Sequence, residues 1–208
     1  MSMNINRDIV YISNYSKKYG KDLILKIEEF SFYRGYSYLL VGGNGCGKST
    51  LIKSILGFLK YNGVINVNTY SIAYLPERIQ KADFLTINEY FSMILCLDKK
   101  SDHIECLKGY LEEFGLNGNT KITSLSKGMF QKVNIILTLI LDRELIIMDE
   151  PLNGLDNETQ KKFINKINRE RSKGKSIIIS THYPYTYKSI FDKIIRIENK
   201  TIYEVNSF

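Results

Sequence analysis

The sequence is poor in cysteine and proline, and it contains no tryptophan. Its 208 residues include three prolines and three cysteines, Cys46, Cys96 and Cys106. The cysteines are odd in number and lack the spacing of metal ligands. This pattern indicates a protein of a reducing compartment rather than a secreted, disulfide-linked one.

Long apolar runs are also missing. The longest, Ile135–Leu141, is interrupted by Thr138 and is far shorter than the ~20 residues that a membrane-spanning helix needs. Residues 1–7 contain no apolar core of a secretion signal. We therefore expect a soluble chain that reaches a membrane only through a partner.

The basic residues outnumber the acidic ones without forming a cluster. Lysine plus arginine minus aspartate plus glutamate is 29 − 22, a formal charge of +7. Because the basic residues are scattered, we interpret them as a solvated surface and expect no nucleic-acid partner. Binding of nucleic acid or of an anionic membrane face is the alternative explanation of the charge. With 44% hydrophobic and 25% charged residues, the chain has the composition of a globular domain with a sizeable core.

A glycine-rich loop is the most informative segment that the sequence does contain. The apolar run that ends at Val41 is followed by the spacing G-x-x-x-x-G-K-[ST], with Gly42 first and Ser49 last. Glycines allow backbone N–H groups to face phosphate oxygens, and the helix that follows directs its positive dipole end toward them. Lys48 suits the β- and γ-phosphates, and the Ser49 hydroxyl suits Mg²⁺.

The context of this loop favours a nucleoside triphosphate site over a chance turn. A strand-like run from Tyr36 precedes it, and Ile52, Ile55, Leu56 and Leu59 follow at helical spacing. The predicted nucleotide contacts of the loop are Gly42, Gly43, Asn44, Gly45, Cys46, Gly47, Lys48, Ser49 and Thr50.

Two later apolar runs end in polar residues. Leu145–Met148 is typical of a strand buried on both faces, and it is followed by Asp149 and Glu150. The carboxyl ends of parallel strands are where α/β sheets bind ligands. Asp149 is therefore a candidate Mg²⁺ ligand, and Glu150 a candidate base for the attacking water. The next buried run ends at His182, which we interpret as a γ-phosphate contact rather than a structural histidine.

Helical patterns fill the region between the glycine-rich loop and the first of these two runs, from Thr86 onward. A helix is expected to begin near Ser126, with Val133, Ile136, Leu137, Ile140 and Leu141 on one face. Ser126 is a good N-cap, which explains the segment structurally. A serine and a glycine, Gly128, at a helix start also make a competent phosphate site.

The early and late segments read as short strands. Asp8–Ser13 and Leu23–Phe32 are expected to be strands, with Tyr19 in the connection between them. Residues 193–197 and 201–205 are expected to form a closing hairpin. No repeat or long linker interrupts the chain.

Together these motifs resemble the ATP-binding subunits of ABC transporters over nearly the whole chain. The resemblance rests on the Walker A segment Gly42–Thr50, the Walker B segment Leu145–Glu150, a signature-like Leu125–Met129, a D-loop-like Asn153–Asp156, the switch histidine His182, and Tyr19, placed like the aromatic that stacks on adenine.

The resemblance implies an α/β P-loop NTPase fold. Its core is a mostly parallel sheet, with an N-terminal antiparallel β-subdomain and a helical subdomain inserted at approximately residues 84–141 of one domain, 1–208. It also implies ATP and Mg²⁺ as cofactors and ATP hydrolysis as the reaction. Two ATPase subunits, identical or related, would form a head-to-tail dimer in which Ser126 and Gly128 of one face the Walker A loop of the other. The dimer would attach to a transmembrane permease at the inner, cytoplasmic face of the membrane.

The chain departs from the family pattern at three places. Lys127 and Met129 replace a glycine and a glutamine of the signature, and Glu77 stands where the Q-loop has glutamine. Glu77 is accordingly a predicted Mg²⁺ ligand. The compact chain, without an appended regulatory domain, is similar to small exporter subunits. The alternative is an ABC-type ATPase that works without transport, in translation, DNA structuring or iron–sulfur assembly.

Overall fold

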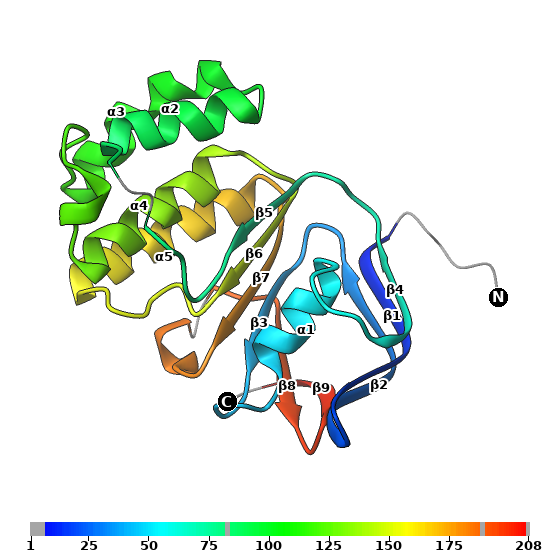
Figure 1. Ribbon diagram of the computed structural model, residues 1–208. Helices are drawn as coiled ribbons and strands as arrows, with labels where there is room; N and C mark the ends of the chain where they lie inside the picture. Colours follow the sequence, from blue (N-terminus) through cyan, green and yellow to red (C-terminus); the bar gives the residue numbers. More distant parts are fainter. Residues whose placement is uncertain (1–6, 82–83, 188–189, 207–208) are drawn as a thin grey trace.

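The computed structural model describes residues 7–81, 84–187 and 190–206. Two sheets lie beside a group of helices, with the N-terminal strands on one side of the molecule and helices α2 and α3 at the other (Figure 1). The N-terminal stretch without an apolar core lies almost wholly outside these residues. No helix within the described ranges is long and apolar enough to cross a membrane.

The smaller sheet is antiparallel, with strand order β2-β1-β4. It consists of β1 (Asp8–Tyr19), β2 (Asp22–Tyr33) and β4 (Asn62–Val67). The prediction that β1 ends at Ser13 and that Tyr19 lies in a connection was wrong. Pairing continues to the Tyr19–Asp22 pair, so that the turn shrinks to two residues, of which Gly20 has a positive φ.

The larger sheet has the order β5-β6-β7-β3-β8-β9. Its strands are β3 (Ser37–Val41), β5 (Ile72–Leu75), β6 (Leu145–Asp149), β7 (Ser176–Thr181), β8 (Lys193–Glu198) and β9 (Thr201–Val205). All neighbours are parallel except β8 and β9, which form the predicted hairpin. Strands β3, β6 and β7 are buried at every position, as their continuous apolar runs predict. Their carboxyl ends therefore meet at one edge of the sheet.

Helix α1 (Lys48–Ile55) follows the glycine-rich loop and is shorter than its apolar spacing predicts. The predicted position Leu59 lies beyond its end. Gly57, with φ of +75°, takes the left-handed conformation in which helices commonly stop. The amide of Phe58 then bonds to the carbonyl of Lys53 at 2.8 Å and closes the helix.

The helices between β5 and β6 are α2 (Ile87–Leu97), α3 (Ile104–Phe114) and α4 (Lys127–Ile140), with 3-10 turns η1 (Ser101–His103) and η2 (Ile122–Ser124). Helix α5 (Asn157–Ser172) and the turn η3 (Pro184–Tyr187) come later in the chain. Helix α4 lies next to the larger sheet, and α2 and α3 lie farther from this sheet than α4 does (Figure 1).

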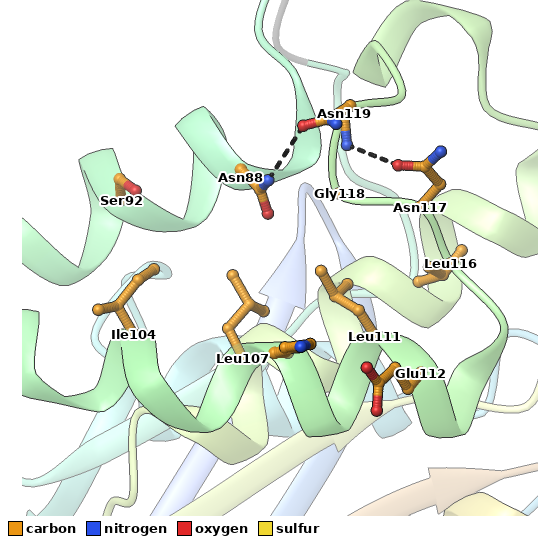
Figure 2. A pocket seen from close by; sticks show the side chains of 11 residues that line it. Asn88, Ser92, Ile104, Leu107, Leu111, Glu112, Leu116, Asn117, Gly118 and Asn119 are labelled. Atoms are coloured by element: carbon orange, nitrogen blue, oxygen red, sulfur yellow. Dashed lines mark hydrogen bonds between the residues drawn. The ribbon is translucent and has the colours of Figure 1, made fainter.

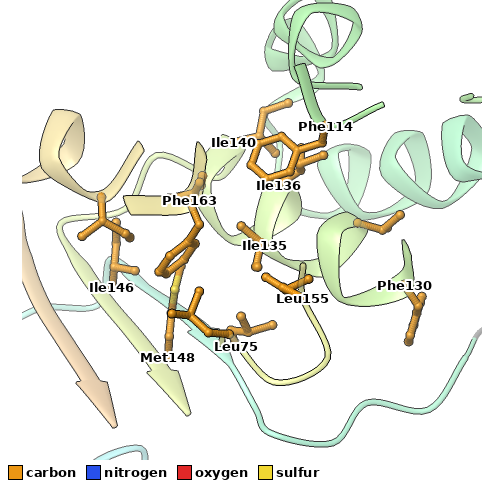
Figure 3. Packing of buried hydrophobic residues seen from close by; sticks show 14 of the residues in the cluster. Leu75, Phe114, Phe130, Ile135, Ile136, Ile140, Ile146, Met148, Leu155 and Phe163 are labelled. Atoms are coloured by element: carbon orange, nitrogen blue, oxygen red, sulfur yellow. The ribbon is translucent and has the colours of Figure 1, made fainter. Parts of the chain in front are cut away.

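Helix α4 is buried on more than one face. Ile135 and Leu139 are buried along with the predicted Val133 and Ile136, because α4 is enclosed between the sheet and α3. Figure 3 shows Phe114 of α3 lying against Ile136 and Ile140, while Ile135 lies nearer to Phe163 of α5. Full burial of each such side chain contributes about 1.5–3 kcal/mol. The middle and the C-terminal part of α4 are thereby packed between α3 and the sheet.

Candidate nucleotide-binding site

The glycine-rich loop joins β3 to α1 and leaves the first turn of α1 open. A Cβ on Gly42 would lie 2.6 Å from the carbonyl oxygen of Ile197, so only glycine fits the loop against β8. Gly47 precedes α1 with a left-handed φ of +113°. Within the described chain no side chain caps this helix, and its first amides remain available to an anion.

Lys48 is the first residue of α1, and its side chain folds back into the glycine-rich loop. Its side chain is 7% exposed, and Nζ donates to the carbonyl oxygens of Gly42 at 2.7 Å and Gly43 at 3.3 Å. The same Nζ lies 3.8 Å from Oε1 of Glu150. A buried ammonium therefore lies between the loop and a buried carboxylate. Because both groups are shielded from water, the electrostatic interaction of this ammonium with nearby charges is stronger than it would be at the surface.

Glu150 and His182 approach each other across the sheet edge. Oε2 of Glu150 lies 2.8 Å from Nδ1 of His182 and 3.4 Å from its backbone amide nitrogen. The pairing of β6 with β7 brings these residues together, since each follows the end of its strand. The two residues predicted to be catalytic are thus in contact.

Asp149 is buried below this pair. Its side chain accepts a hydrogen bond from the hydroxyl of Ser180, and that hydroxyl accepts one from the amide of Glu150 at 3.1 Å. Ser180 thus contacts both acidic residues of the candidate site, although the sequence did not single it out. A polar residue at the end of the buried strand β7, in register with Asp149, was the available signal.

A pocket of about 380 Å³ collects most of the predicted residues. Its lining consists of Asn44, Gly45, Cys46, Gly47, Lys48, Ser49, Thr50, Glu77, Glu150 and His182. Gly42 and Gly43 line an adjoining pocket, which His182 shares. Tyr19, Ser126 and Gly128 are not among the described residues that line either pocket.

Tyr19 is half exposed at the end of β1. Nζ of Lys17 lies 4.7 Å from the centroid of its ring and donates to the carbonyl of Lys60 at 2.6 Å. The cation covers one face of the ring, and a flat base would have to stack on the opposite face. Stacking of adenine on Tyr19 remains a prediction.

Ser126 and Gly128 lie at the start of α4, away from the pocket. The Ser126 hydroxyl caps the helix by accepting from the amide of Met129 at 3.1 Å. A Cβ on Gly128 would lie 2.7 Å from the carbonyl oxygen of Gly154. The glycine is therefore required for a close backbone approach inside this chain, a role that the motif itself does not reveal.

The residues present suit Mg²⁺. Ser49 and Glu77 line the pocket, and Asp149 lies buried behind it, so that the donors are all oxygens, as Mg²⁺ requires. No group of three or more histidines, cysteines or acids is arranged to hold a metal among the described residues.

A second pocket, of about 420 Å³, lies between α2 and α3. Figure 2 shows Leu107 and Leu111 on its floor, with Asn88 and Asn119 near its rim. Asn88 donates to Asn119 across the opening at 3.4 Å. This pocket shares no residue with the glycine-loop pocket.

Comparison with known proteins agrees with this geometry. The profile of the family described as "ABC transporter" matches residues 25–153. The chain is 31% identical over 192 residues to the uncharacterized ABC transporter ATP-binding protein YthP of Bacillus subtilis, covering 90% of this chain and 79% of that protein. It is 29% identical to the zinc import ATP-binding protein ZnuC of Rickettsia bellii, covering 92% and 83%.

A solved structure described as the ATP binding subunit of an ABC transporter superposes with a TM-score of 0.87 at 28% identity, covering 95% of this chain and 89% of that one. The family resemblance and the predicted fold class, an α/β core with an antiparallel N-terminal sheet and helices, are thereby confirmed. The chain belongs to the ABC transporter family, as an ATP-binding subunit.

Proposed function

We propose that this chain binds ATP with Mg²⁺ at the glycine-loop pocket and hydrolyses it to ADP and phosphate to power a membrane transporter. The observation that carries the proposal is the contact set inside one pocket. Lys48, Glu150 and His182 converge there beside the open start of α1. A cation, a carboxylate and an imidazole beside a phosphate cradle are the groups that phosphoryl transfer to water needs.

In this proposal each side chain has its own task. Lys48 neutralises charge on the β- and γ-phosphates, and the open amides of α1 bind the remaining oxygens. Glu150 accepts a hydrogen bond from the attacking water and polarises it. His182 presents Nδ1 to Glu150, so that Nε2 is left for the γ-phosphate. Mg²⁺, held through Ser49, Glu77 and Asp149, supplies charge stabilisation to the phosphates when bound.

A second subunit completes the site in this proposal. Ser126 and Gly128 lie outside the pocket of their own chain but at a helix start, which suits a phosphate. A head-to-tail dimer of ATPase subunits would bring these residues to the other subunit's nucleotide. ATP would then close the dimer, and hydrolysis would reopen it.

The substitution Glu150→Gln tests the ATPase assignment. It removes the base while preserving shape, so we expect kcat to fall by about 10²- to 10⁴-fold with nucleotide affinity retained and an ATP-bound dimer visible by light scattering. The matched control is Glu105→Gln on the exposed start of α3, which should turn over normally. Unchanged turnover in Glu150→Gln would refute the role of Glu150.

The transport role includes a transmembrane permease that holds the chain at the cytoplasmic face of the membrane. We propose an outward direction of transport, supported by Glu77 at the Q-loop position and by the likeness to a relative that is named for linearmycin resistance. The linearmycin resistance ATP-binding protein LnrL of Bacillus subtilis is 31% identical to this chain over 201 residues. Relatives named for zinc import represent the opposite direction.

Co-purification in mild detergent tests the transport role. A tagged chain should retain one integral membrane protein through a wash that removes unbound lipid and protein. Cells without the chain should become more sensitive to a toxic peptide or antibiotic if transport is outward. Retention of ribosomes or DNA in place of a membrane protein would favour an ATPase that works without transport.

A further inference from the structure

The turn that carries Glu150 has an uncommon backbone conformation. Glu150 has φ of +51°, in the left-handed region that residues with a Cβ rarely occupy. Such a conformation persists only where neighbouring groups fix it. The direction in which the Glu150 side chain leaves the backbone therefore depends on what holds this turn, in addition to the contacts of its carboxylate with Lys48 and His182.

Strand β7 holds the turn on its N-terminal side. The amide of Glu150 donates to the carbonyl oxygen of Ser180 at 3.2 Å and to its hydroxyl at 3.1 Å. The hydroxyl of Ser180 in turn donates to Asp149. This part of the support belongs to the sheet and is set by strand register.

Helix α4 holds the turn on its C-terminal side. Nε2 of Gln131, in the second turn of α4, donates to the carbonyl oxygen of Pro151 at 2.9 Å. Pro151 directly follows Glu150 and is buried, and its ring fixes its own φ. The carbonyl of Pro151 belongs to the peptide unit between Pro151 and Leu152. Because the ring fixes the φ of Pro151, holding this carbonyl restrains the orientation of the residue that is bonded directly to Glu150.

Two other contacts join the start of α4 to the segment after Glu150, and neither one restrains that residue as closely. Gly128 approaches the carbonyl of Gly154, four residues beyond Glu150. Lys132 lies 3.5 Å from Asp156, whose side chain is 59% exposed, and such an exposed pair contributes little. The bond from Gln131 is the contact placed to act on the turn.

We propose that Gln131 is a positioning residue for ATP hydrolysis, which holds the left-handed turn so that the Glu150 carboxylate faces the attacking water. The proposal rests on the proposed function, in which Glu150 is the base. Gln131 is not among the described residues that line the two pockets of the site, and it acts through Pro151. The same hydrogen bond joins the N-terminal part of α4, where Ser126 and Gly128 lie, to the turn that carries Glu150.

Gln160 provides a matched control for this role. Its Nε2 donates to the carbonyl oxygen of Leu155 at 3.0 Å, from α5 to the same loop. The residue type, the kind of bond and the length are shared with the Gln131 contact, but the carbonyl lies five residues beyond Glu150. A general loosening of the loop would affect both variants alike.

The experiment compares Gln131→Met with Gln160→Met in the full chain. Met keeps the length and helix preference of Gln and removes the donor. We expect Gln131→Met to lower kcat about tenfold or more, since small misplacements of a reacting group are costly, with KM and the dissociation constant of a fluorescent ATP analogue within about twofold. Gln160→Met should keep kcat within about twofold, with a similar thermal midpoint. Gln131→Glu also lacks the donor, should match Gln131→Met in kcat, and provides a second test if the Met variant folds poorly.

Equal kcat in the two Met variants would overturn the proposal, as would a normal kcat in Gln131→Glu. A double variant, Gln131→Met with Glu150→Gln, shows whether Gln131 acts through Glu150. The loss caused by Gln131→Met should vanish in that background, and a full multiplicative loss would overturn the proposal. Normal turnover in Glu150→Gln alone would instead refute the base assignment, so the two failures are distinguishable.

Discussion

The N-termini of α1 and α4 contain the same residue types but differ in what those residues bind. The glycine-rich loop before α1 and the segment 125–129 before α4 both combine glycine, serine and a lysine at a helix N-terminus. At α1 the cap residue is the left-handed Gly47, and no described side chain occupies the first amides. At α4 the Ser126 hydroxyl already bonds to the amide of Met129.

The glycines differ in the same way. In the loop before α1, Gly42 makes room for the neighbouring strand and the loop folds around Lys48. Before α4, Gly128 makes room for the backbone of Gly154 in the same chain. The first start is open and lies in a pocket with acids, whereas the second is internally satisfied. A helix start with the residue types of a phosphate site can therefore have one of its amides already bonded to a side chain of its own chain.

Removal of the Lys48 side chain tests the role of the open N-terminus of α1, and we expect it to change activity most. Lys48→Ala removes the buried cation that faces both the loop carbonyls and Glu150. We expect kcat/KM for ATP to fall by about 100-fold or more, since charge stabilisation in a buried site is a large catalytic term. Steady-state phosphate release measures it.

Lys53→Ala is the matched control, because Lys53 is an exposed lysine on the same helix. It should leave turnover within about twofold, as surface changes usually do. Equal losses in the two variants would mean that the charge of α1, and not the position of Lys48, governs activity.

The second prediction tests the close approach at α4. Gly128→Ala would place a Cβ 2.7 Å from the carbonyl of Gly154, and overpacking of this kind costs about 1–3 kcal/mol in the free energy of unfolding. Urea denaturation of the full chain measures it. Gly109→Ala, in α3 with nothing within 4 Å of its Cβ, should instead stabilise the chain by about 0.5–1 kcal/mol. Stabilisation by Gly128→Ala, as by Gly109→Ala, would show that the approach to Gly154 is not tight.

The sequence was sufficient to predict the open site and much of the sheet. Buried parallel strands can be recognised as continuous apolar runs, so the strands that precede Glu150 and His182 could be located in the sequence. Because the carboxyl ends of parallel strands lie at one edge of a sheet, both residues were expected at that edge. The contact between Glu150 and His182 then required only that β6 and β7 be neighbours.

Contacts between segments distant in the chain could not be predicted. The close approach of Gly128 to Gly154 and the bond from Gln131 to Pro151 depend on how α4 packs beside the sheet, which no local pattern encodes. The same limit explains α4 itself: its apolar positions predicted one buried face, and enclosure by α3 and the sheet buried more. Local spacing specifies elements, and packing specifies which of their polar groups remain free.

A labelling experiment measures how open the first start is. Cys46 lines the nucleotide pocket, while Cys96 and Cys106 are exposed elsewhere. At an ATP concentration of about ten times the dissociation constant, alkylation of Cys46 should slow by about tenfold, because the unbound fraction falls in that proportion. The two exposed cysteines, quantified by peptide mass spectrometry in the same sample, should be unaffected. Equal slowing at all three would indicate a change in reagent or fold rather than occupation of the loop.

The smallest effect separates the two roles of Ser126. Ser126→Ala removes the cap of α4 and should lower the free energy of unfolding by about 1 kcal/mol. Ser124→Ala, in η2 and outside α4, removes only an exposed hydrogen bond to the carbonyl of Lys121 and should change it by less than about 0.5 kcal/mol. Ser126→Asp preserves a good cap but places a carboxylate where the partner's phosphate would bind. If Ser126 serves both purposes, the Asp variant has wild-type stability and loses the ATP-induced dimer in light scattering. If the Asp variant still dimerises with ATP, the helix start before α4 is a structural cap alone, and its likeness to the loop before α1 ends at the sequence.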